Sequence, residues 1–189
     1  WLTKLLENKG YRPGIVSRGY GGSSPKNPII VDDSTSVKIS GDEPVIIYKN
    51  TLRPVCISSN RISAVRKLLQ DTDTNIVISD DGLQHYKMDR DLEIVIFDGN
   101  RGVGNGLCLP AGPLREPLDR IEDADFFVSS SKIIDLNTKH HKYLMNYQPI
   151  EWARIADNKR FRADSWPLSK NVHAVAGISN PAKFYKTLS

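Results

Sequence analysis

Two adjacent acids, Asp80 and Asp81, directly follow the apolar run 76–79 in this chain of 189 residues. A strand end fixes a carboxylate well, and carboxylate oxygens are ligands that Mg²⁺ prefers. Nucleotide-hydrolysing P-loop proteins hold Mg²⁺ beside phosphate groups in this way. The alternative is that the two acids only cap a turn. Gln84 and His85 favour a binding site, because an amide and an imidazole beside two acids are costly to place without a ligand.

A second acidic pair, Asp42 and Glu43, lies between Gly41 and Pro44, ahead of the apolar run 45–48. Asp42 stands where a helix N-cap is expected, and a proline suits the first turn that follows. This structural role would explain the pair by itself. An acid beside a helix N-terminus could also accept a proton from a substrate hydroxyl or hold magnesium, and the two roles are compatible.

Two further polar segments are rich in glycine. Arg18 and Tyr20 stand among three glycines, and Arg101 and Asn105 stand among four. A cationic fork next to glycines suits the close approach of a sugar or a phosphate group. A plain glycine-rich turn is the simpler interpretation of each segment when it is taken alone.

Short apolar runs alternate with helical patterns along the chain. Runs rich in β-branched residues predict buried strands at 15–17, 55–58, 76–79, 94–97, 126–129 and 172–176. Apolar residues three or four positions apart predict helices over 60–70 and at the N-terminus, where Gly10 ends the pattern. This alternation indicates an α/β fold with a mostly parallel sheet covered by helices on both faces. Ligands bind such sheets outside the carboxyl ends of the strands, where the polar segments fall.

The composition of the chain changes after about residue 131, where a polar segment begins. The predicted divisions are a core domain over 1–140, a linker with an antiparallel hairpin over 141–168, and the beginning of a second, smaller α/β lobe over 169–189. Alternation and aromatic residues over 150–166 predict the hairpin, and the pattern at 181–188 predicts a helix. We expect both ends of the chain to be cuts in a longer protein, since it begins with Trp1 rather than methionine.

The overall charge is mildly basic, with a formal net charge of +4 and a pI near 9.0. Such a charge favours anionic partners such as nucleotides, phospholipid surfaces or phosphorylated substrates. Nucleic acid is not expected as a partner, because there is no dense block of basic residues and no interleaved stacking aromatics. No apolar stretch of about 18 residues predicts a membrane span, and no signal sequence is evident.

Several enzyme classes have no support in the sequence. Cys56 and Cys108 lie far apart without CxxC or Cys/His spacing, which disfavours a disulfide framework or a zinc site and suits a reducing cytoplasm. His140, His141 and His173 have no partner at metal-ligand spacing and are interpreted as surface or core residues. The absence of GxSxG and HExxH motifs disfavours serine hydrolases and zinc proteases.

The phosphate-binding loop GxxxxGK[ST], which should accompany an acid-ended strand, does not occur in the sequence. Either the protein is not a nucleotide-hydrolysing enzyme, or the loop precedes Trp1. The helical pattern over 1–8 leads into a predicted strand, so it is well placed to be the end of the helix that would follow such a loop.

Taken together, the ordered motifs of this chain resemble the tetraacyldisaccharide 4'-kinases of lipid A biosynthesis. The motifs are Ser-Arg-Gly-Tyr-Gly-Gly at 17–22, Gly-Asp-Glu-Pro at 41–44, Asp-Asp-Gly-Leu-Gln-His at 80–85, Asn-Gly at 105–106 and Leu-Pro-Ala-Gly-Pro-Leu-Arg-Glu at 109–116. Their order and spacing agree with the family, and the resemblance covers nearly the whole chain. It implies a P-loop-kinase-like sheet, of which the P-loop strand is missing here.

The resemblance also implies an activity and a set of roles. The enzyme would use ATP and Mg²⁺ to phosphorylate the 4'-hydroxyl of an acylated glucosamine disaccharide 1-phosphate at the cytoplasmic face of the bacterial inner membrane. Asp42 and Asp81 would be the catalytic acids, with Asp42 as the general base, and Glu43 and Asp80 would hold the metal. Residues expected toward the glycolipid or its phosphate are Arg18, Tyr20, Arg61, Gln84, His85, Arg101 and Asn105.

The family's P-loop and membrane-anchoring helix would lie before Trp1, and a C-terminal lobe supplying a histidine would lie beyond Ser189. Without the P-loop, the chain alone is predicted to lack kinase activity. No protein partner is predicted. The alternatives are a P-loop kinase or ligase with another acceptor, and a non-catalytic module that binds a glycolipid or a nucleotide.

Overall fold

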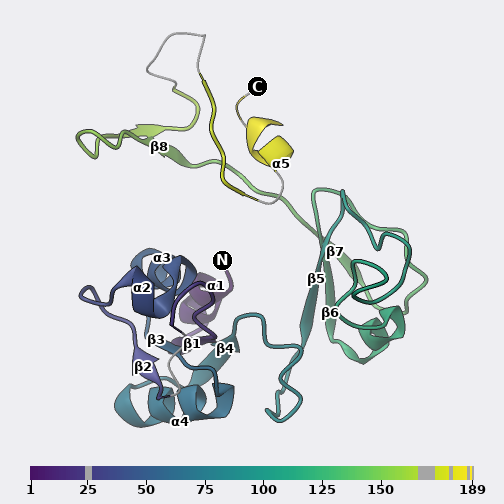
Figure 1. Cartoon of the computed structure of the whole chain (residues 1–189), viewed down its shortest axis with the longest axis horizontal. Coiled ribbons are helices and arrows are strands. Elements are labelled where there is room, and N and C mark those ends of the chain that lie inside the picture. Colours follow the sequence, from purple (N-terminus) through teal and green to yellow (C-terminus); the bar gives the residue numbers. More distant parts are fainter. Residues whose placement is uncertain (24–26, 166–172, 179–180, 187, 189) are drawn as a thin grey trace. The chain divides into compact units, whose positions relative to one another are not determined.

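The computed structural model describes residues 1–23, 27–165, 173–178, 181–186 and 188 of the chain. Its helices are α1 (Leu2–Asn8), α2 (Val37–Ser40), α3 (Asp42–Thr51), α4 (Arg61–Asp71) and α5 (Pro181–Lys186), with a 3₁₀ helix at Leu118–Asp123 (Figure 1). Its strands are β1 (Pro13–Ser17), β2 (Ile29–Ile30), β3 (Val55–Ile57), β4 (Ile76–Ser79), β5 (Ile94–Asp98), β6 (Phe126–Ser130), β7 (Lys142–Met145), β8 (Glu151–Ala153) and β9 (Arg160–Arg162). The predictions of β1, β3, β4, β5 and β6 are therefore confirmed, as are those of the helices α1, α4 and α5.

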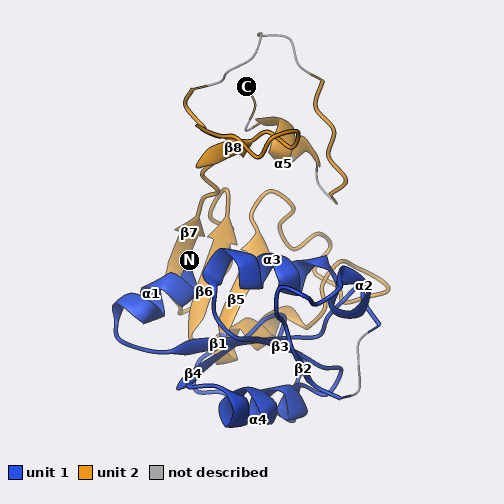
Figure 2. Ribbon diagram, turned by 90° about the vertical axis from the view of Figure 1, so that its left-hand side faces the viewer, with its two compact units in different colours: residues 1–93 blue, residues 94–189 orange. Residues whose placement is uncertain are grey.

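The chain divides into two compact units, residues 1–93 and residues 94–189, which are coloured separately in Figure 2. Each is described by itself below. The division into a core domain, a linker and a second lobe, with boundaries near 140 and 168, remains a prediction. Across the described part of the chain, no helix combines the length and the apolar character needed to cross a membrane.

The first unit is built on a four-stranded sheet in the order β2-β3-β1-β4. β1 runs parallel to both of its neighbours, with Ile15 opposite Val55 of β3 and Ile78 of β4. β2 pairs with β3 in the antiparallel direction, so the sheet is mixed but mostly parallel, as predicted. The carboxyl ends of β1, β3 and β4 consequently open onto the same edge of the sheet.

Helices cover both faces of this sheet. On one face, Ile15, Val31, Val55 and Ile57 form a buried cluster, and apolar residues 45, 47 and 48 of α3 pack against it. On the other face, a second cluster joins β1 and β3 to α4 (Figure 1). Successive strand residues point to opposite faces, which explains why runs such as 15–16 supply both clusters. Each fully buried aliphatic side chain contributes about 1.5–3 kcal/mol, so the two clusters dominate the stability of the unit.

Cys56 belongs to the second cluster and is completely buried. Burial raises the pKa of its thiol to about 11, so the group stays protonated near neutral pH. A protonated, inaccessible thiol is a poor nucleophile and a poor metal ligand. Cys56 is therefore a core residue, and no disulfide forms with Cys108, which is also a free cysteine.

The beginning of α3 differs from the prediction that Asp42 is its N-cap. The N-cap is Gly41, with φ 77° and ψ 169°, and Asp42 is the first residue inside the helix. The Asp42 carboxylate accepts a hydrogen bond from the N–H of Glu43 at 3.0 Å. A glycine suits this position, because a close backbone contact at residue 41, described below, excludes any side chain there.

The second unit contains a parallel sheet in the order β5-β6-β7. One face is packed: Phe127 is completely buried and its ring lies 5.2 Å from that of Phe97. The opposite face leaves Ile96, Phe126 and Tyr143 exposed. β7 lies within the segment predicted as a linker, and no strand was predicted at its position.

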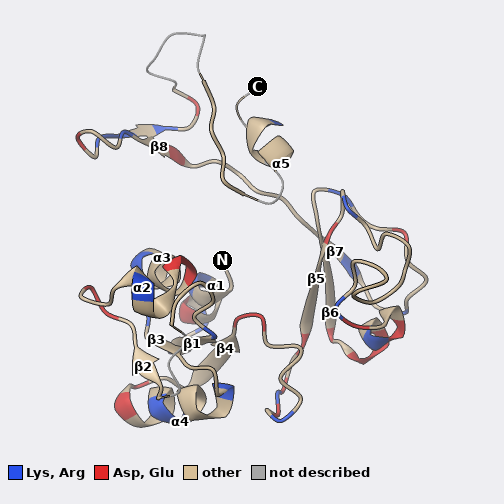
Figure 3. Ribbon diagram, viewed as in Figure 1, with Lys and Arg blue, Asp and Glu red and all other residues tan. Residues whose placement is uncertain are grey.

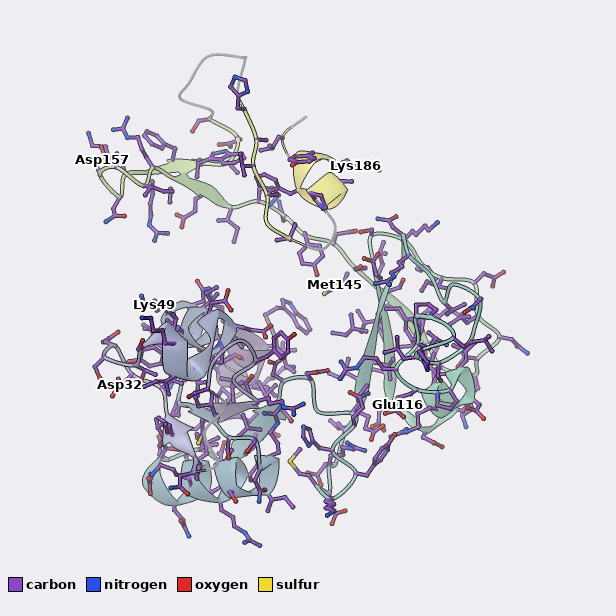
Figure 4. All side chains as sticks on the ribbon, in the orientation of Figure 1. Asp32, Lys49, Glu116, Met145, Asp157 and Lys186 are labelled. Atoms are coloured by element: carbon purple, nitrogen blue, oxygen red, sulfur yellow. The ribbon has the colours of Figure 1, made fainter. Side chains whose placement is uncertain are left out.

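An antiparallel hairpin of β8 and β9 follows, in the region where alternating polarity predicted one. Asp157, labelled in Figure 4, lies in its connecting turn and accepts hydrogen bonds from Arg154 at the end of the hairpin. The prediction of a strand over 172–176 is wrong for its described residues. Residues 173–176 form no strand, and residue 172 lies outside the described part of the chain. Val175 there is 90% exposed, so the run lacks the sheet neighbours that would bury a strand.

Candidate active site

The site forms in the first unit, at the edge where the parallel strands β1 and β4 end. Asp80 is the residue that ties these ends together. Its N–H donates to the carbonyl of Val16 at 2.9 Å, and its carboxylate accepts from the hydroxyl of Ser17 at 3.2 Å. Both partners lie more than 60 positions earlier in the sequence. The acid is thus held by the neighbouring strand rather than by its own turn.

Arg61, the first residue of α4, holds the same turn from the helix side. Its side chain is nearly fully buried, and Nη2 donates to the carbonyl of Asp80 at 2.9 Å. Nε and Nη1 are also buried and have no hydrogen-bond partner. Burial lowers the pKa of Arg61, while the charges of Asp80 and Asp81 act in the opposite direction. Buried guanidinium donors without a partner are costly, so an acceptor such as an anion or a water molecule would stabilise Arg61 here.

The two acidic pairs come together electrostatically. The residue Glu43 is exposed overall, but its carboxyl group is partly desolvated, which raises its pKa. The negative charges of Asp80, Asp42 and Asp81 raise the pKa further. Carboxylates affect each other in this way only when they are close in space. The acidic residues at the beginning of α3 are red in Figure 3.

Close glycine contacts fix the loop after β1 against the beginning of α3. A Cβ added to Gly41 would lie 2.0 Å from the carbonyl oxygen of Tyr20, and one added to Gly22 would lie 2.3 Å from that of Ile39. No side chain fits at either position. The segment that carries Arg18 and Tyr20 is therefore locked to the segment that presents Asp42 and Glu43.

Two arginines and a histidine border the acids. Burial lowers the pKa of His85, and the positive charges of Arg61 and Arg18 lower it further, while Asp81 raises it. Arg18 also lowers the pKa of Arg61. Residues from the loop after β1, from α4 and from the turn after β4 thus lie within electrostatic reach of one another. Such an arrangement suits a phosphate group, whose charge the cations would balance.

Other predicted residues are exposed, belong to the second unit or bond within their own loops. Tyr20 is 81% exposed on its loop. Arg101 and Asn105 belong to the second unit. The Asn105 amide donates to the carbonyl of Ala111 at 2.9 Å and accepts from the N–H of Leu107 at 3.2 Å, so it closes its own loop. Gln84 lies partly buried in the turn after β4.

The carboxylates at this edge of the sheet are candidate ligands for a magnesium ion. Within the described residues, no three His, Cys, Asp or Glu side chains form a ready-made metal cluster. Mg²⁺ commonly uses only one or two carboxylates, with water and substrate phosphates completing its shell. The raised pKa of Glu43 beside Asp80 marks an excess of negative charge that a divalent cation would relieve. The residues present therefore fit Mg²⁺ held together with a nucleotide.

Sequence reasoning missed two residues that hold this site. Ser17 is the last residue of the strand predicted at 15–17. Its polar side chain in that apolar strand was the feature that could have marked it as part of the site. Arg90 donates to the carbonyls of Gly82 and Leu83 at 3.1 and 3.2 Å, and nothing in the sequence pattern marked it.

Comparison with known proteins identifies the family of this chain. The family model for tetraacyldisaccharide-1-phosphate 4'-kinases (LpxK) matches residues 1–189. The chain belongs to this family. A tetraacyldisaccharide 4'-kinase of Hahella chejuensis is 42% identical over 188 residues, covering 100% of this chain and 54% of the relative. One of Photobacterium profundum is also 42% identical, with 52% of its length covered. The chain thus spans about half the length of these LpxK relatives.

A solved structure supports the LpxK assignment and the fold. The crystal structure of LpxK from Aquifex aeolicus in complex with ATP has a TM-score of 0.65 and 30% sequence identity. The match covers 76% of this chain and 47% of that one. The P-loop-kinase-like α/β fold expected from the motifs is therefore confirmed.

Proposed function

We propose that the protein containing this chain transfers the γ-phosphate of ATP to the 4'-hydroxyl of a tetraacylated glucosamine disaccharide 1-phosphate. The observation that carries the proposal is the electrostatic convergence of Asp42 and Glu43 with Asp80 and Asp81. Family membership and the name of the ATP-bound relative support the choice of substrates. Phosphoryl transfer depends on alignment and charge neutralisation, which a cluster of acids bordered by cations can supply.

In the proposed mechanism, Asp42 is the general base. Its carboxylate accepts the proton of the 4'-hydroxyl as that oxygen bonds to the γ-phosphorus, and the bond from phosphorus to the bridging oxygen of ADP breaks. A hydrogen bond from the N–H of Glu43 to Oδ1 of Asp42 holds the carboxylate in place at the beginning of α3.

Glu43 and Asp80 are proposed to hold Mg²⁺, and Asp81 to lie at the reacting groups as a second catalytic acid. When bound, Mg²⁺ would neutralise charge on the phosphate oxygens of ATP. Arg18, Arg61 and His85 are proposed to face the phosphate or the sugar, because they lie within electrostatic reach of one another beside the acids. Tyr20, Gln84, Arg101 and Asn105 are proposed to contact the glycolipid on the strength of the family motif alone.

The inner-membrane surface is proposed as the working environment, at its cytoplasmic face, because the acylated substrate would reside in a bilayer. The net charge of +4 suits an anionic lipid surface. Cosedimentation with vesicles of anionic phospholipid, compared with zwitterionic vesicles, measures this association. Equal partition into both kinds of vesicle would contradict the electrostatic part of the proposal.

The activity can be tested directly by following phosphate transfer from ATP to the disaccharide in a full-length enzyme that contains this chain. Asp80→Asn is expected to lower kcat by about a hundredfold or more, because the strand-end carboxylate is lost. Asp73→Asn is the matched control, an exposed acid of the same unit that precedes β4. Absence of transfer by the unmodified enzyme with Mg²⁺ present would refute the proposed function.

The chain of 189 residues alone is proposed to lack turnover, since no phosphate-binding loop occurs in its sequence. Calorimetry with Mg-ATP and with the phosphorylated disaccharide tests what remains of binding. Turnover near that of a full-length enzyme would contradict this proposal. Binding of the disaccharide without any transfer in the full-length enzyme would favour a non-catalytic glycolipid module.

A further inference from the structure

Arg90 makes contacts that neither its neighbours in sequence nor the family motifs indicate. Its Nη1 donates to two successive carbonyl oxygens, those of Gly82 at 3.1 Å and Leu83 at 3.2 Å. Its Nε forms an ion pair with Glu93, whose side chain is only 11% exposed. The guanidinium therefore bridges the turn after β4 and is itself oriented by a nearly buried carboxylate.

The bridged turn is the one that carries the acids of the candidate site. Gly82 also accepts a hydrogen bond from the N–H of His85 at 3.0 Å, which closes the turn. A Cβ added to Gly82 would lie 2.5 Å from the Ser79 hydroxyl, so the turn lies tightly against the end of β4. Asp81, with φ 50°, has a left-handed conformation that an isolated aspartate adopts only at a cost in free energy. Such a turn needs outside contacts to keep its shape.

The chemistry of arginine suits this task. A guanidinium presents five N–H donors in a rigid plane, so one group can reach adjacent carbonyls and a carboxylate together. A lysine ammonium would carry the charge but lacks that fixed fork. Arg61 holds the carbonyl of Asp80 from α4, so the two arginines act on the turn from different elements.

We propose that Arg90, oriented by Glu93, is a positioning residue that holds the turn bearing Asp80, Asp81 and His85 in the geometry for phosphoryl transfer. This inference rests on the proposed kinase function. It assigns Arg90 no contact with substrate, because its hydrogen bonds are directed to the turn and to Glu93.

The first test compares variants in a full-length enzyme containing this chain. Arg90→Met is expected to lower kcat about 10- to 100-fold, since small displacements of reacting groups are costly. The KM values for both substrates should stay within about threefold, because binding groups are retained. Arg90→Lys should recover only a small part of kcat, and Glu93→Gln should show an intermediate loss.

Arg12→Met is the matched control. Arg12 also donates from its side chain to a backbone carbonyl, that of Asp73 at 2.6 Å, and pairs with the carboxylate of the same residue at 3.4 Å. Arg12 directly precedes β1, and its partner Asp73 precedes β4. Both residues therefore lie at the end of these parallel strands that is opposite the candidate site. This variant removes the same charge from the same unit, and kcat should remain near that of the unmodified enzyme.

A second test needs no activity and uses amide hydrogen exchange in the full-length enzyme. In Arg90→Met, the N–H of His85 should exchange about tenfold faster or more, because the carbonyl it bonds to has lost its clamp. The pKa of His85, followed by NMR, should rise, since Arg90 is one of the cations that lower it. Arg61, Arg18 and Asp81 also act on that ring and are unchanged in the variant.

The outcomes separate the inference from the proposed function. An unmodified enzyme without transfer would refute the function, while exchange at His85 would still decide whether Arg90 clamps the turn. Equal kcat in Arg90→Met and Arg12→Met would overturn the positioning role and leave the function standing. Unchanged exchange at His85 would overturn the clamp itself.

Discussion

The loops that follow β4 and β5 look alike in sequence, but they hold their polar side chains differently. After β4, Asp80 is bonded to groups of β1 and α4. After β5, Asp98 accepts from the N–H groups of Asn100 and Arg101, and Asn105 bonds within its own loop. The polar residues after β5 bond within their own loop, and these bonds account for its shape. Asp80 is instead held by β1 and α4, as suits a residue positioned for binding or catalysis.

The two units show the same contrast in their sheets. In the first unit, helices cover both faces, and residues such as Ile57 are completely buried. In the second unit, one face of the β5-β6-β7 sheet is packed around Phe127, and Ile96 on the other face is 60% exposed. A rigid, doubly covered sheet is the better support for reacting groups, because its strand ends move little.

The largest expected effect is a loss of kcat, and it distinguishes an acid of the first unit from an acid of the second unit. In a full-length enzyme, Asp42→Ala should lower kcat about a hundredfold or more, as expected for loss of a general base. Asp98→Ala should change kcat by less than about tenfold, because that carboxylate supports its own turn. Initial rates at saturating Mg-ATP measure both. An unchanged kcat would remove Asp42 from the mechanism, and equal losses would remove the contrast between the loops.

Two glycines with positive φ provide the next test. Gly41→Ala should destabilise the first unit by about 2 kcal/mol or more, because the added Cβ would lie 2.0 Å from a backbone oxygen. Gly102→Ala in the second unit meets no atom within 4 Å, so only backbone strain of about 1 kcal/mol is expected. Hydrogen exchange resolved by unit measures each loss. Similar losses would mean that the close contact at Gly41 relaxes easily.

A smaller effect is expected for the side chain that closes the loop after β5. Asn105→Ala removes two hydrogen bonds to the loop backbone and should destabilise that loop by about 1 kcal/mol. Faster exchange at the N–H of Leu107 measures this loss. If the KM for the disaccharide rises while the exchange rate is unchanged, Asn105 acts on the substrate rather than on its loop.

The smallest effect follows from the raised pKa of Glu43. Above the ordinary value of 4.5, the folded state holds the ionised carboxylate less favourably than the unfolded chain does, so this group destabilises the fold. Glu43→Gln should therefore raise Tm near pH 7 by about 1–3 °C, since the group is largely exposed. Below pH 4 both states are protonated, and the gain should vanish. A lower Tm of Glu43→Gln at pH 7 would contradict the inference that neighbouring carboxylates disfavour the ionised form of Glu43.

Much of the fold and part of the site could be predicted from local patterns. Apolar runs located β1, β3, β4, β5 and β6, and the acid motifs at 42–43 and 80–81 lie together electrostatically. β7 was missed because its run is short and its surroundings are polar, so pairing with β6 decides its state. The predicted strand over 172–176 has the composition of a strand, but its described residues have no sheet neighbours, and β propensity depends on such neighbours.

The sequence by itself determined the α/β pattern, the order of the motifs and the family, because these depend on residue type and spacing along the chain. Only the tertiary structure decided which polar groups meet. Ser17 bonds to Asp80 and Arg90 clamps the carbonyls of 82 and 83 through strand pairing and loop closure. The contact between Ser17 and Asp80 depends on the register of β1 with β4, which no local pattern encodes.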